Sequence, residues 1–313
     1  MGQVAIIILQ YGNADATIDC ISSVIKYNTY KVKFIVVDNG SPEESDRVQL
    51  SDAVRRLFGS VIEVDDQYIP DAPLPQVTIV KSAVNDGYAR GNNKGLRLAY
   101  ADGDIDQVLI LNNDTLFVED IIPKLVADIN TLHDAALVTP LLYKKDLQGV
   151  DVNCARNYNS MRDSAIVNML LTYCPASVYR RCYIPVSPST GIHKVSIVSG
   201  SCMMCRKDLF ESVGGFDPGT FLYWEENILA EKFKRIGKRN YVDTDIKCIH
   251  LGASTTRRVK SYKILRHSID SQLYFARNYW PARTSFKLAA LKLSASWLLL
   301  VFAVHDRLFK RKK

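Results

Sequence analysis

The chain has 313 residues, of which 47% are hydrophobic and 23% are charged, an ordinary composition for a soluble globular protein of one large domain or two small ones. The net charge of +7 is uneven: residues 254–313 carry 14 Lys and Arg against two acidic residues, whereas residues 1–253 carry a net charge of −5. A mildly acidic body with a basic tail predicts that the tail meets an anionic surface. Aromatic residues do not alternate with basic ones in the tail as in a nucleic-acid recognition module, so a membrane leaflet is favoured over nucleic acid.

The chain begins MGQVAIIILQYGN, with no basic segment before an apolar run that stops at Leu9. This pattern predicts a first β-strand rather than a signal peptide. The seven cysteines are scattered, and we expect reduced thiols in a cytosolic protein. CMMC at 202–205 has the spacing of a redox or zinc site, but no second Cys or His pair completes one, so we expect cysteines buried in a strand.

The first 140 residues alternate short apolar runs with amphipathic stretches. The apolar runs are nearly continuous, which indicates strands covered on both faces of a mainly parallel sheet, and the alternation predicts an α/β fold. SPEES at 41–45 is typical of a helix start, with Ser41 as the capping residue. We expect strands at 4–10, 33–38, 77–80, 108–111 and 136–140, and helices at 15–28, 41–57 and 89–101.

Residues 141–195 lose this rhythm and are rich in Tyr, Arg, Asn and Pro, with one helix expected near 164–172. So irregular a stretch in a compact protein is usually functional or mobile. Order returns with a strand at 195–205, a short helix at 207–213 and the turn-rich loop GGFDPGTF. A helix over 224–236 and two strand-like runs that end in IHLG follow.

Two helices are expected at the end of the chain, over 261–279 and 284–304, broken at Pro281. From Leu293 to Val304 only two serines are polar, a run short of the roughly 20 apolar residues that span a membrane. Trp297, Phe302 and the leucines, followed by a basic cluster, favour a helix that lies in the interface of an anionic membrane. A homodimer interface and simple packing on the core are the alternatives.

Polar residues follow several of the expected strands. Asp38 ends the second strand, where a carboxylate can bind a nucleobase or ribose or form an Asx turn. NDGYARGNNKG at 85–95 differs from the dinucleotide fingerprint G-x-G-x-x-G, which disfavours a Rossmann dehydrogenase. Its glycines suit a close approach of the backbone to a ligand or a neighbouring strand.

Carboxylates occur at two further places. Asp114 follows Asn112 and Asn113 at a strand end, and these hard oxygen donors suit Mg²⁺ or Mn²⁺, with a plain turn as the alternative. Glu225 and Glu226 open a helix behind an aromatic run, either as partners of the helix dipole or as a general base. His250 is a lone histidine at a strand end and by itself predicts no ligand role.

Five segments in this order, VVDNGS, NDGYARGNNKG, LILNNDT, VGGFDPGTFLYWEEN and IHLGAST, resemble the family 2 glycosyltransferases of the GT-A fold. The resemblance is strongest to the rhamnosyltransferase-like branch, which builds bacterial surface polysaccharide, and it covers roughly residues 3–256. It implies a GT-A domain over 1–256, with a mixed, mainly parallel sheet flanked by helices. A basic, helical, membrane-associating extension over 257–313 is expected to follow.

The resemblance also implies a site, residue by residue. Asp114 would hold Mg²⁺ or Mn²⁺ together with His250, and Glu226 would be the catalytic base with Glu225 beside it. This sequence departs from the family in its single metal-binding carboxylate and in Ile228, which stands where many members carry a second acid. The donor-binding positions would be Gln10, Tyr11, Asp38, Asn85, Gly87, Gly91, Asn93, Asn112 and Asn113, and the loop over donor and acceptor would contain Phe216, Asp217 and Trp224.

The implied reaction is an inverting, metal-dependent glycosyl transfer in the synthesis of O-antigen or capsule polysaccharide. A sugar, with rhamnose favoured, would move from dTDP-rhamnose or a UDP-hexose to a hydroxyl of a glycan acceptor linked to polyprenyl diphosphate. The enzyme would act in the cytoplasm as a peripheral protein on the inner face of the plasma membrane. The alternatives are a sugar nucleotidyltransferase and a non-catalytic, membrane-attached nucleotide-sugar binding protein.

Overall fold

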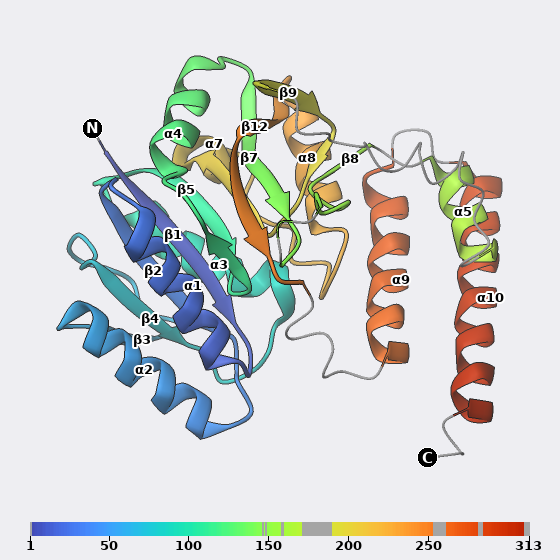
Figure 1. Ribbon diagram of the computed structural model, residues 1–313. Helices are drawn as coiled ribbons and strands as arrows, with labels where there is room; N and C mark the ends of the chain where they lie inside the picture. Colours follow the sequence, from blue (N-terminus) through green and yellow to red (C-terminus); the bar gives the residue numbers. More distant parts are fainter. Residues whose placement is uncertain are drawn as a thin grey trace.

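The computed structural model describes residues 2–145, 147, 149–157, 160–170, 190–252, 261–280 and 284–309. A ten-stranded sheet runs through the body in the order β3-β4-β2-β1-β5-β11-β7-β12-β6, with β9 beside β12, and β8 and β10 form a separate pair (Figure 1). The strands are β1 (Gln3–Gln10), β2 (Val32–Asp38), β3 (Ile62–Asp65), β4 (Val77–Lys81), β5 (Ile105–Asn112), β6 (Thr115–Phe117), β7 (Ala135–Tyr143), β8 (Ala155–Arg156), β9 (Ile192–Val195), β10 (Ile197–Val198), β11 (Cys202–Arg206) and β12 (Arg239–His250).

Helices cover both faces of this sheet. In Figure 1, α1 and α2 lie in front of the parallel strands and α3 lies behind them. The helices are α1 (Ala14–Tyr27), α2 (Glu44–Phe58), α3 (Gly87–Ala101), α4 (Ile122–Thr131), α5 (Met161–Leu170), α7 (Lys207–Ser212), α8 (Glu225–Arg235), α9 (Ser261–Asn278) and α10 (Ser285–Phe309).

The half of the sheet from β3 to β5 is entirely parallel. The carboxyl ends of β1, β2, β4 and β5 therefore lie along one edge, and the chain reverses its direction of winding at β1. Open α/β sheets bind ligands in the crevice at such a point. The predicted α/β fold with a mixed, mainly parallel sheet is confirmed. The short strands β3 and β6 and the helix α4 were not expected from the sequence.

The glycines of α3 allow the helix to lie close to β1. A β-carbon on Gly95 would come within 2.6 Å of the Ile7 side chain, and one on Gly91 would come equally close to Leu9. Ile7 is fully buried, so its side chain has little room to move away from a β-carbon on Gly95. Of the two interpretations of these glycines, a close approach to a neighbouring strand is therefore the one seen at these two positions.

Two local predictions have clear outcomes. The start of α2 differs from the predicted capping box, because Glu43 is the N-cap and makes no side-chain cap bond. Ser41 lies two residues earlier, and its hydroxyl contacts Asp38 instead. The CMMC cysteines, Cys202 and Cys205, are buried and free on β11, as expected for a strand.

The C-terminal helices stand beside the body, with α5 lying along α10 (Figure 1). They bury an apolar cluster of their own, made of Met161, Ile228, Phe275, Ala276, Trp280 and Leu291. Ile228 of α8 is 1% exposed there, so an acid at this position would be buried in an apolar contact, which is costly. The predicted boundary between 256 and 257 lies outside the described residues, and the division into two domains stays a prediction.

Candidate active site

The predicted nucleotide-binding residues of the first two strands lie side by side, since Gln10 of β1 pairs with Asp38 of β2. The Gln10 side chain is fully buried, and neither its nitrogen nor its oxygen has a hydrogen-bond partner among the described residues. Tyr11, the next residue, is partly exposed. A buried amide without partners is costly, so this position suits a polar ligand at the sheet edge.

Asp38 is buried and already has partners within the protein. Its carboxylate accepts hydrogen bonds from the Ser41 backbone nitrogen at 3.2 Å and from the Ser41 hydroxyl, and it forms an ion pair with Arg47 Nε at 3.2 Å. Ser41 Oγ in turn accepts a hydrogen bond from the Gly12 nitrogen at 2.9 Å. These contacts join the loops that follow β1 and β2. The proposed role of Asp38 in binding the donor stays a prediction.

The segment that leads into α3 is organised by Asn39, a residue outside the predicted site. Asn39 Nδ2 donates to Asn85 Oδ1 at 3.0 Å and to the Gly87 carbonyl at 3.1 Å. Asn85 Oδ1 also accepts from the Gly87 nitrogen at 2.9 Å. Gly87 has a φ of +81°, and a β-carbon there would lie 2.2 Å from the Phe221 carbonyl oxygen. Only glycine fits this close contact between α3 and the 216–224 loop.

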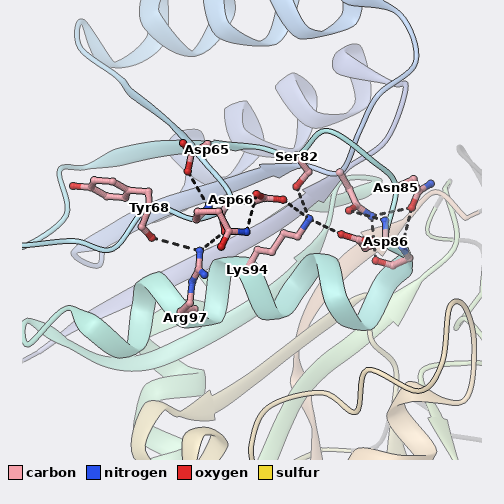
Figure 2. A network of polar contacts seen from close by, with 11 residues as sticks. Asp65, Asp66, Tyr68, Ser82, Asn85, Asp86, Lys94 and Arg97 are labelled. Atoms are coloured by element: carbon pink, nitrogen blue, oxygen red, sulfur yellow. Dashed lines mark hydrogen bonds and ion pairs between the residues drawn. The ribbon is translucent and has the colours of Figure 1, made fainter.

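Asn93 and Lys94 of α3 also contact other protein groups. The Asn93 side chain donates to the Phe216 carbonyl at 2.8 Å and accepts from the Phe216 nitrogen at 2.9 Å, so it anchors the 216–224 loop. Lys94 Nζ donates a hydrogen bond to Ser82 Oγ at 2.8 Å and forms ion pairs with Asp86 at 2.7 Å and Asp66 at 2.9 Å (Figure 2). Burial acts to lower the pKa of Lys94, but these acidic partners raise it above its ordinary value. Lys94 is therefore a charged residue that joins the segment before α3 to the loop after β3.

The structure brings Asp114 and His250, the two predicted metal ligands, together. Because β12 pairs antiparallel with β6, His250 lies opposite Thr115, and its Nε2 is 3.5 Å from Asp114 Oδ1. His250 Nδ1 lies 2.7 Å from Asp151 Oδ2, and Nε2 lies 3.2 Å from Ser201 Oγ. Burial acts to lower the pKa of His250, but hydrogen bonds to Asp114 and Asp151 raise it to about 9.

This donor set fits a divalent metal ion that is bound jointly with a phosphate ligand. A carboxylate oxygen and an imidazole nitrogen face the same space, and a carboxylate at the other ring nitrogen is the usual way of orienting a metal-binding histidine. The described residues contain no group of three His, Cys, Asp or Glu side chains suited to a metal. Two protein ligands are sufficient for Mg²⁺ or Mn²⁺ when substrate phosphates and water supply the rest.

Asn112 and Asn113 contribute mainly through local geometry. The Asn112 backbone nitrogen donates to the Ser201 carbonyl at 2.9 Å. Asn113 is buried, and its Nδ2 donates to Thr17 Oγ1 of α1 at 3.1 Å. Asn113 is therefore directed towards the protein interior, whereas Asp114 reaches His250.

The two adjacent glutamates of α8 have different surroundings. Glu225 is 4% exposed, and burial together with the nearby charge of Glu226 raises its pKa to about 8. The Glu226 side chain is 20% exposed and lies 3.3 Å from the Arg156 guanidinium. Its Oε1 accepts a hydrogen bond from the Gly200 nitrogen at 3.2 Å. Of the pair, Glu226 is the carboxylate with solvent access and a cationic partner.

The turn at 199–201 connects these groups, and it was not among the predicted site residues. Gly200 binds Glu226 through its nitrogen, and its carbonyl accepts a hydrogen bond from the Tyr88 hydroxyl at 2.7 Å. Ser201 contacts His250 through its side chain and Asn112 through its carbonyl. Asp151 and Arg156, two further partners, come from the irregular 141–195 stretch. The only sequence signal was the small-residue string SGS before a strand, which is too common to be specific.

The predicted residues of the 216–224 loop are distributed over its two sides. Phe216 is buried and packs edge-on against Tyr88, with ring centroids 5.6 Å apart. Asp217 faces the C-terminal end of α9 and accepts hydrogen bonds from Tyr274 of α9 and from Tyr279, the first residue after that helix. Trp224 precedes α8 in a left-handed conformation with a φ of +71°. Contacts of these residues with a donor or an acceptor stay predictions.

The chain shares sequence features with known proteins. The family model described as Glycosyl transferase family 2 matches residues 5–214. N-acetylglucosaminyl-diphospho-decaprenol L-rhamnosyltransferase of Mycobacterium tuberculosis is 23% identical over 209 residues, which are 64% of this chain and 67% of that protein. Low-salt glycan biosynthesis hexosyltransferase Agl10 of Haloferax volcanii is 25% identical over 171 residues, which are 52% of this chain and 50% of that protein.

Two solved structures have a similar fold. GalNAc-T7, determined with UDP, GalNAc and Mn²⁺, superposes with a TM-score of 0.61 at 13% identity over 95% of this chain, which spans about half (55%) of that protein. The mannosyltransferase PcManGT from Pyrobaculum calidifontis, in complex with GDP-Man and Mn²⁺, has a TM-score of 0.54 at 18% identity and covers 97% of this chain and 73% of that one. At these identities the similarity concerns the fold, and it confirms the expected GT-A architecture.

The turn at 199–201 predicts a specific cost for a side chain at Gly200. A β-carbon there would lie 2.8 Å from Tyr88 Oη and 3.0 Å from Glu226 Oε1. We expect Gly200→Ala to lower the free energy of unfolding by about 1–3 kcal/mol, because two partly buried hydrogen bonds are disturbed. Gly103→Ala is the matched control, since nothing lies within 4 Å of the added carbon. Urea denaturation in which both variants match the wild type would contradict the packing described.

Proposed function

The chain belongs to glycosyl transferase family 2, and from this premise we propose that it transfers a sugar from a nucleotide-diphosphate donor to a hydroxyl of a glycan acceptor, with inversion at the anomeric carbon. The proposal depends chiefly on one observation. The turn at 199–201 contacts both Glu226 and the Asp114–His250 pair, so a candidate base and a candidate metal site lie next to the same turn.

Glu226 is assigned as the base because of its surroundings. The Arg156 guanidinium lies 3.3 Å from it and the Gly200 nitrogen donates a hydrogen bond to it, and these contacts hold Glu226 at a partly exposed position. Glu225, with a pKa raised to about 8, retains its proton at neutral pH and is buried. A protonated acid cannot accept the proton of an attacking hydroxyl, so the two residues differ in what they can do.

In the proposed reaction, Glu226 accepts the proton of the acceptor hydroxyl as that oxygen attacks the anomeric carbon. A single displacement on the face opposite the leaving group inverts the configuration. Asp114 and His250 would hold Mg²⁺ or Mn²⁺, which when bound stabilises the negative charge of the departing diphosphate. Asp151 orients the His250 ring, and the buried amide of Gln10, which has no hydrogen-bond partner among the described residues, would face the nucleotide at the end of β1.

The donor is proposed to be dTDP-rhamnose, with UDP-hexoses as alternatives, and the acceptor a polyprenyl-diphosphate-linked glycan of O-antigen or capsule synthesis. The support is the resemblance to rhamnosyltransferases. The name of the Mycobacterium tuberculosis relative describes a rhamnosyltransferase that acts on a decaprenol-linked acceptor. Asp151 and Arg156, from the irregular 141–195 stretch, contact His250 and Glu226, and we propose that this stretch meets the acceptor.

The enzyme is further proposed to bind the inner face of the plasma membrane from the cytoplasm through α10. Among the described helices, Ser285–Val304 of α10 is by length and composition able to cross a membrane, and 22% of it is buried. One face of α10 packs on α5 and α9 and carries the buried Ser294, whereas Lys292 is exposed. A helix with one face packed on protein and the other face apolar and uncovered suits the interface better than a span. The uncovered face presents Phe286, Leu293, Trp297, Leu300 and Val304.

Replacing Glu226 tests the assignment of the base. We expect Glu226→Gln to lower the release of nucleotide from the donor by about 10²–10⁴-fold with unchanged donor affinity, because a positioned base contributes about that much. Glu225→Gln should cost at least tenfold less, since the amide resembles the protonated acid, and the exposed Glu211→Gln should retain the wild-type rate. The measurement is the release of dTDP from dTDP-rhamnose or of UDP from UDP-glucose, with Mn²⁺.

A Glu226→Gln variant that works at the wild-type rate would contradict the base assignment. A larger loss in Glu225→Gln than in Glu226→Gln would transfer the role to Glu225. A wild type that binds nucleotide sugars but releases no nucleotide, even with glycan acceptor, would favour the non-catalytic binding protein.

Charge on the uncovered face of α10 tests the membrane proposal. We expect the wild type to float with vesicles that contain phosphatidylglycerol, and the double variant Leu293→Glu, Leu300→Glu to stay in solution, because two carboxylates oppose insertion next to anionic lipid. Val48→Glu, a control at an exposed apolar residue of α2 that is 51% accessible, should float normally. Equal flotation of the wild type and the double variant would refute the proposal. So would a dimer in solution that the double variant splits while the wild type binds no vesicles.

A further inference from the structure

The 216–224 loop, which leads directly into the two glutamates of α8, is held from two opposite sides. On one side α3 binds it through the two Asn93–Phe216 hydrogen bonds and through the Tyr88 nitrogen, which donates to the Phe221 carbonyl at 2.9 Å. On the other side α9 binds it. The base-bearing end of this loop therefore depends on the C-terminal helices as well as on the body.

Asp217 is the main polar contact between the loop and α9. Its carboxylate accepts hydrogen bonds from the Gly219 nitrogen at 2.7 Å, from the Tyr274 hydroxyl at 2.9 Å and from the Tyr279 hydroxyl. Burial and the Asp217 carboxylate both raise the pKa of the two tyrosines, so they remain protonated donors. Gly219 packs against Tyr274 so closely that a β-carbon would fall 2.1 Å from the ring.

The end of the loop is strained, and α9 covers it. Tyr223 and Trp224 have φ angles of +70° and +71°, a conformation that costs energy in residues other than glycine and persists only where the surroundings impose it. The Trp224 ring packs on Phe275 of α9 and on Trp280, which follows the end of α9, with centroids 5.4 Å and 6.1 Å away. The Ser271 hydroxyl donates to the Leu222 carbonyl at 3.0 Å.

We propose that Tyr274 and Tyr279 are positioning residues for Glu226, acting through Asp217 and the strained turn at Tyr223 and Trp224. Glu225 and Glu226 follow that turn immediately as the first residues of α8. A loop released from α9 can relax at the turn and rotate the start of α8, which moves Glu226 away from the Gly200 nitrogen. The C-terminal helices thereby belong to the catalytic apparatus in addition to any role in anchoring. This inference rests on the proposed function of Glu226.

The three tryptophans of the chain provide a reporter of this contact that does not depend on activity. Trp224 and Trp280 lie in the contact itself, and Trp297 lies on the uncovered face of α10. In a Trp297→Phe background, acrylamide quenching of the remaining fluorescence measures how well α9 covers the end of the loop. The test variant is Tyr274→Phe, Tyr279→Phe. The control is Tyr262→Phe, 12 residues before Tyr274 on the same helix and about 18 Å from it.

We expect the double variant to show at least twofold stronger quenching and about tenfold lower kcat for nucleotide release from the donor, with a donor KM within twofold of the background protein. The control should match the background in all three. Unchanged quenching, or increased quenching with unchanged kcat, would overturn the proposal, and so would a KM effect without a kcat effect. If neither the wild type nor Trp297→Phe releases nucleotide, the proposed function fails, and unchanged quenching would still refute the contact between the tyrosines and the loop. Tyr274→Phe alone, a milder change, should move quenching and kcat in the same direction.

Discussion

The hydrogen bond from the Gly200 nitrogen to Glu226, together with the contact between Ser201 and His250, is the arrangement on which the candidate site depends. The turn at 199–201 comes immediately before β11, and β11 pairs antiparallel with β5 so that Cys202 lies opposite Leu111. This register places the turn beside the polar end of β5, where Asp114 follows. Sheet pairing therefore fixes the position of the turn that contacts both the candidate base and His250, while the 216–224 loop and α8 bring Glu226 to that turn. Space for the turn exists because residue 200 has no side chain.

The second organising feature is the attachment of the C-terminal helices to the same region. Ile228 of α8 faces α9 and α10, which explains an apolar residue where related enzymes often have an acid. Inside this helical unit, Asn168 of α5 donates to Gln272 of α9 at 2.8 Å and lies 3.4 Å from Ser294 of α10. A buried polar contact of this kind fixes how three helices pack. The apolar face of α10, Tyr274 and Tyr279 at the end of α9, and the candidate base of α8 are thus connected through one set of packed helices.

The sequence was informative where local pattern controls structure. The strands β1, β2, β4 and β5 are continuous apolar runs, and the polar residues after them had to meet at one edge once the strands were parallel. It was uninformative where partners come from distant segments: Asp151 lies 99 residues from His250, and Tyr274 lies 57 residues from Asp217. The capping prediction for Ser41 was wrong because Asp38 and the Gly12 nitrogen compete for its side chain. β3 is short and partly exposed, so it lacks the apolar pattern of a buried strand.

The most direct test of the account is whether nucleotide release depends on a metal held by Asp114. Release of dTDP from dTDP-rhamnose, or of UDP from UDP-glucose, is measured for the wild type and for Asp114→Asn, each with Mn²⁺ and with EDTA. The account predicts release by the wild type with Mn²⁺, its loss in EDTA, and a loss of at least 10²-fold in Asp114→Asn that extra Mn²⁺ restores only partly. Equal release by the wild type in EDTA, or by Asp114→Asn at wild-type rates, would contradict the assignment of Asp114, His250 and Glu226 to the reaction centre.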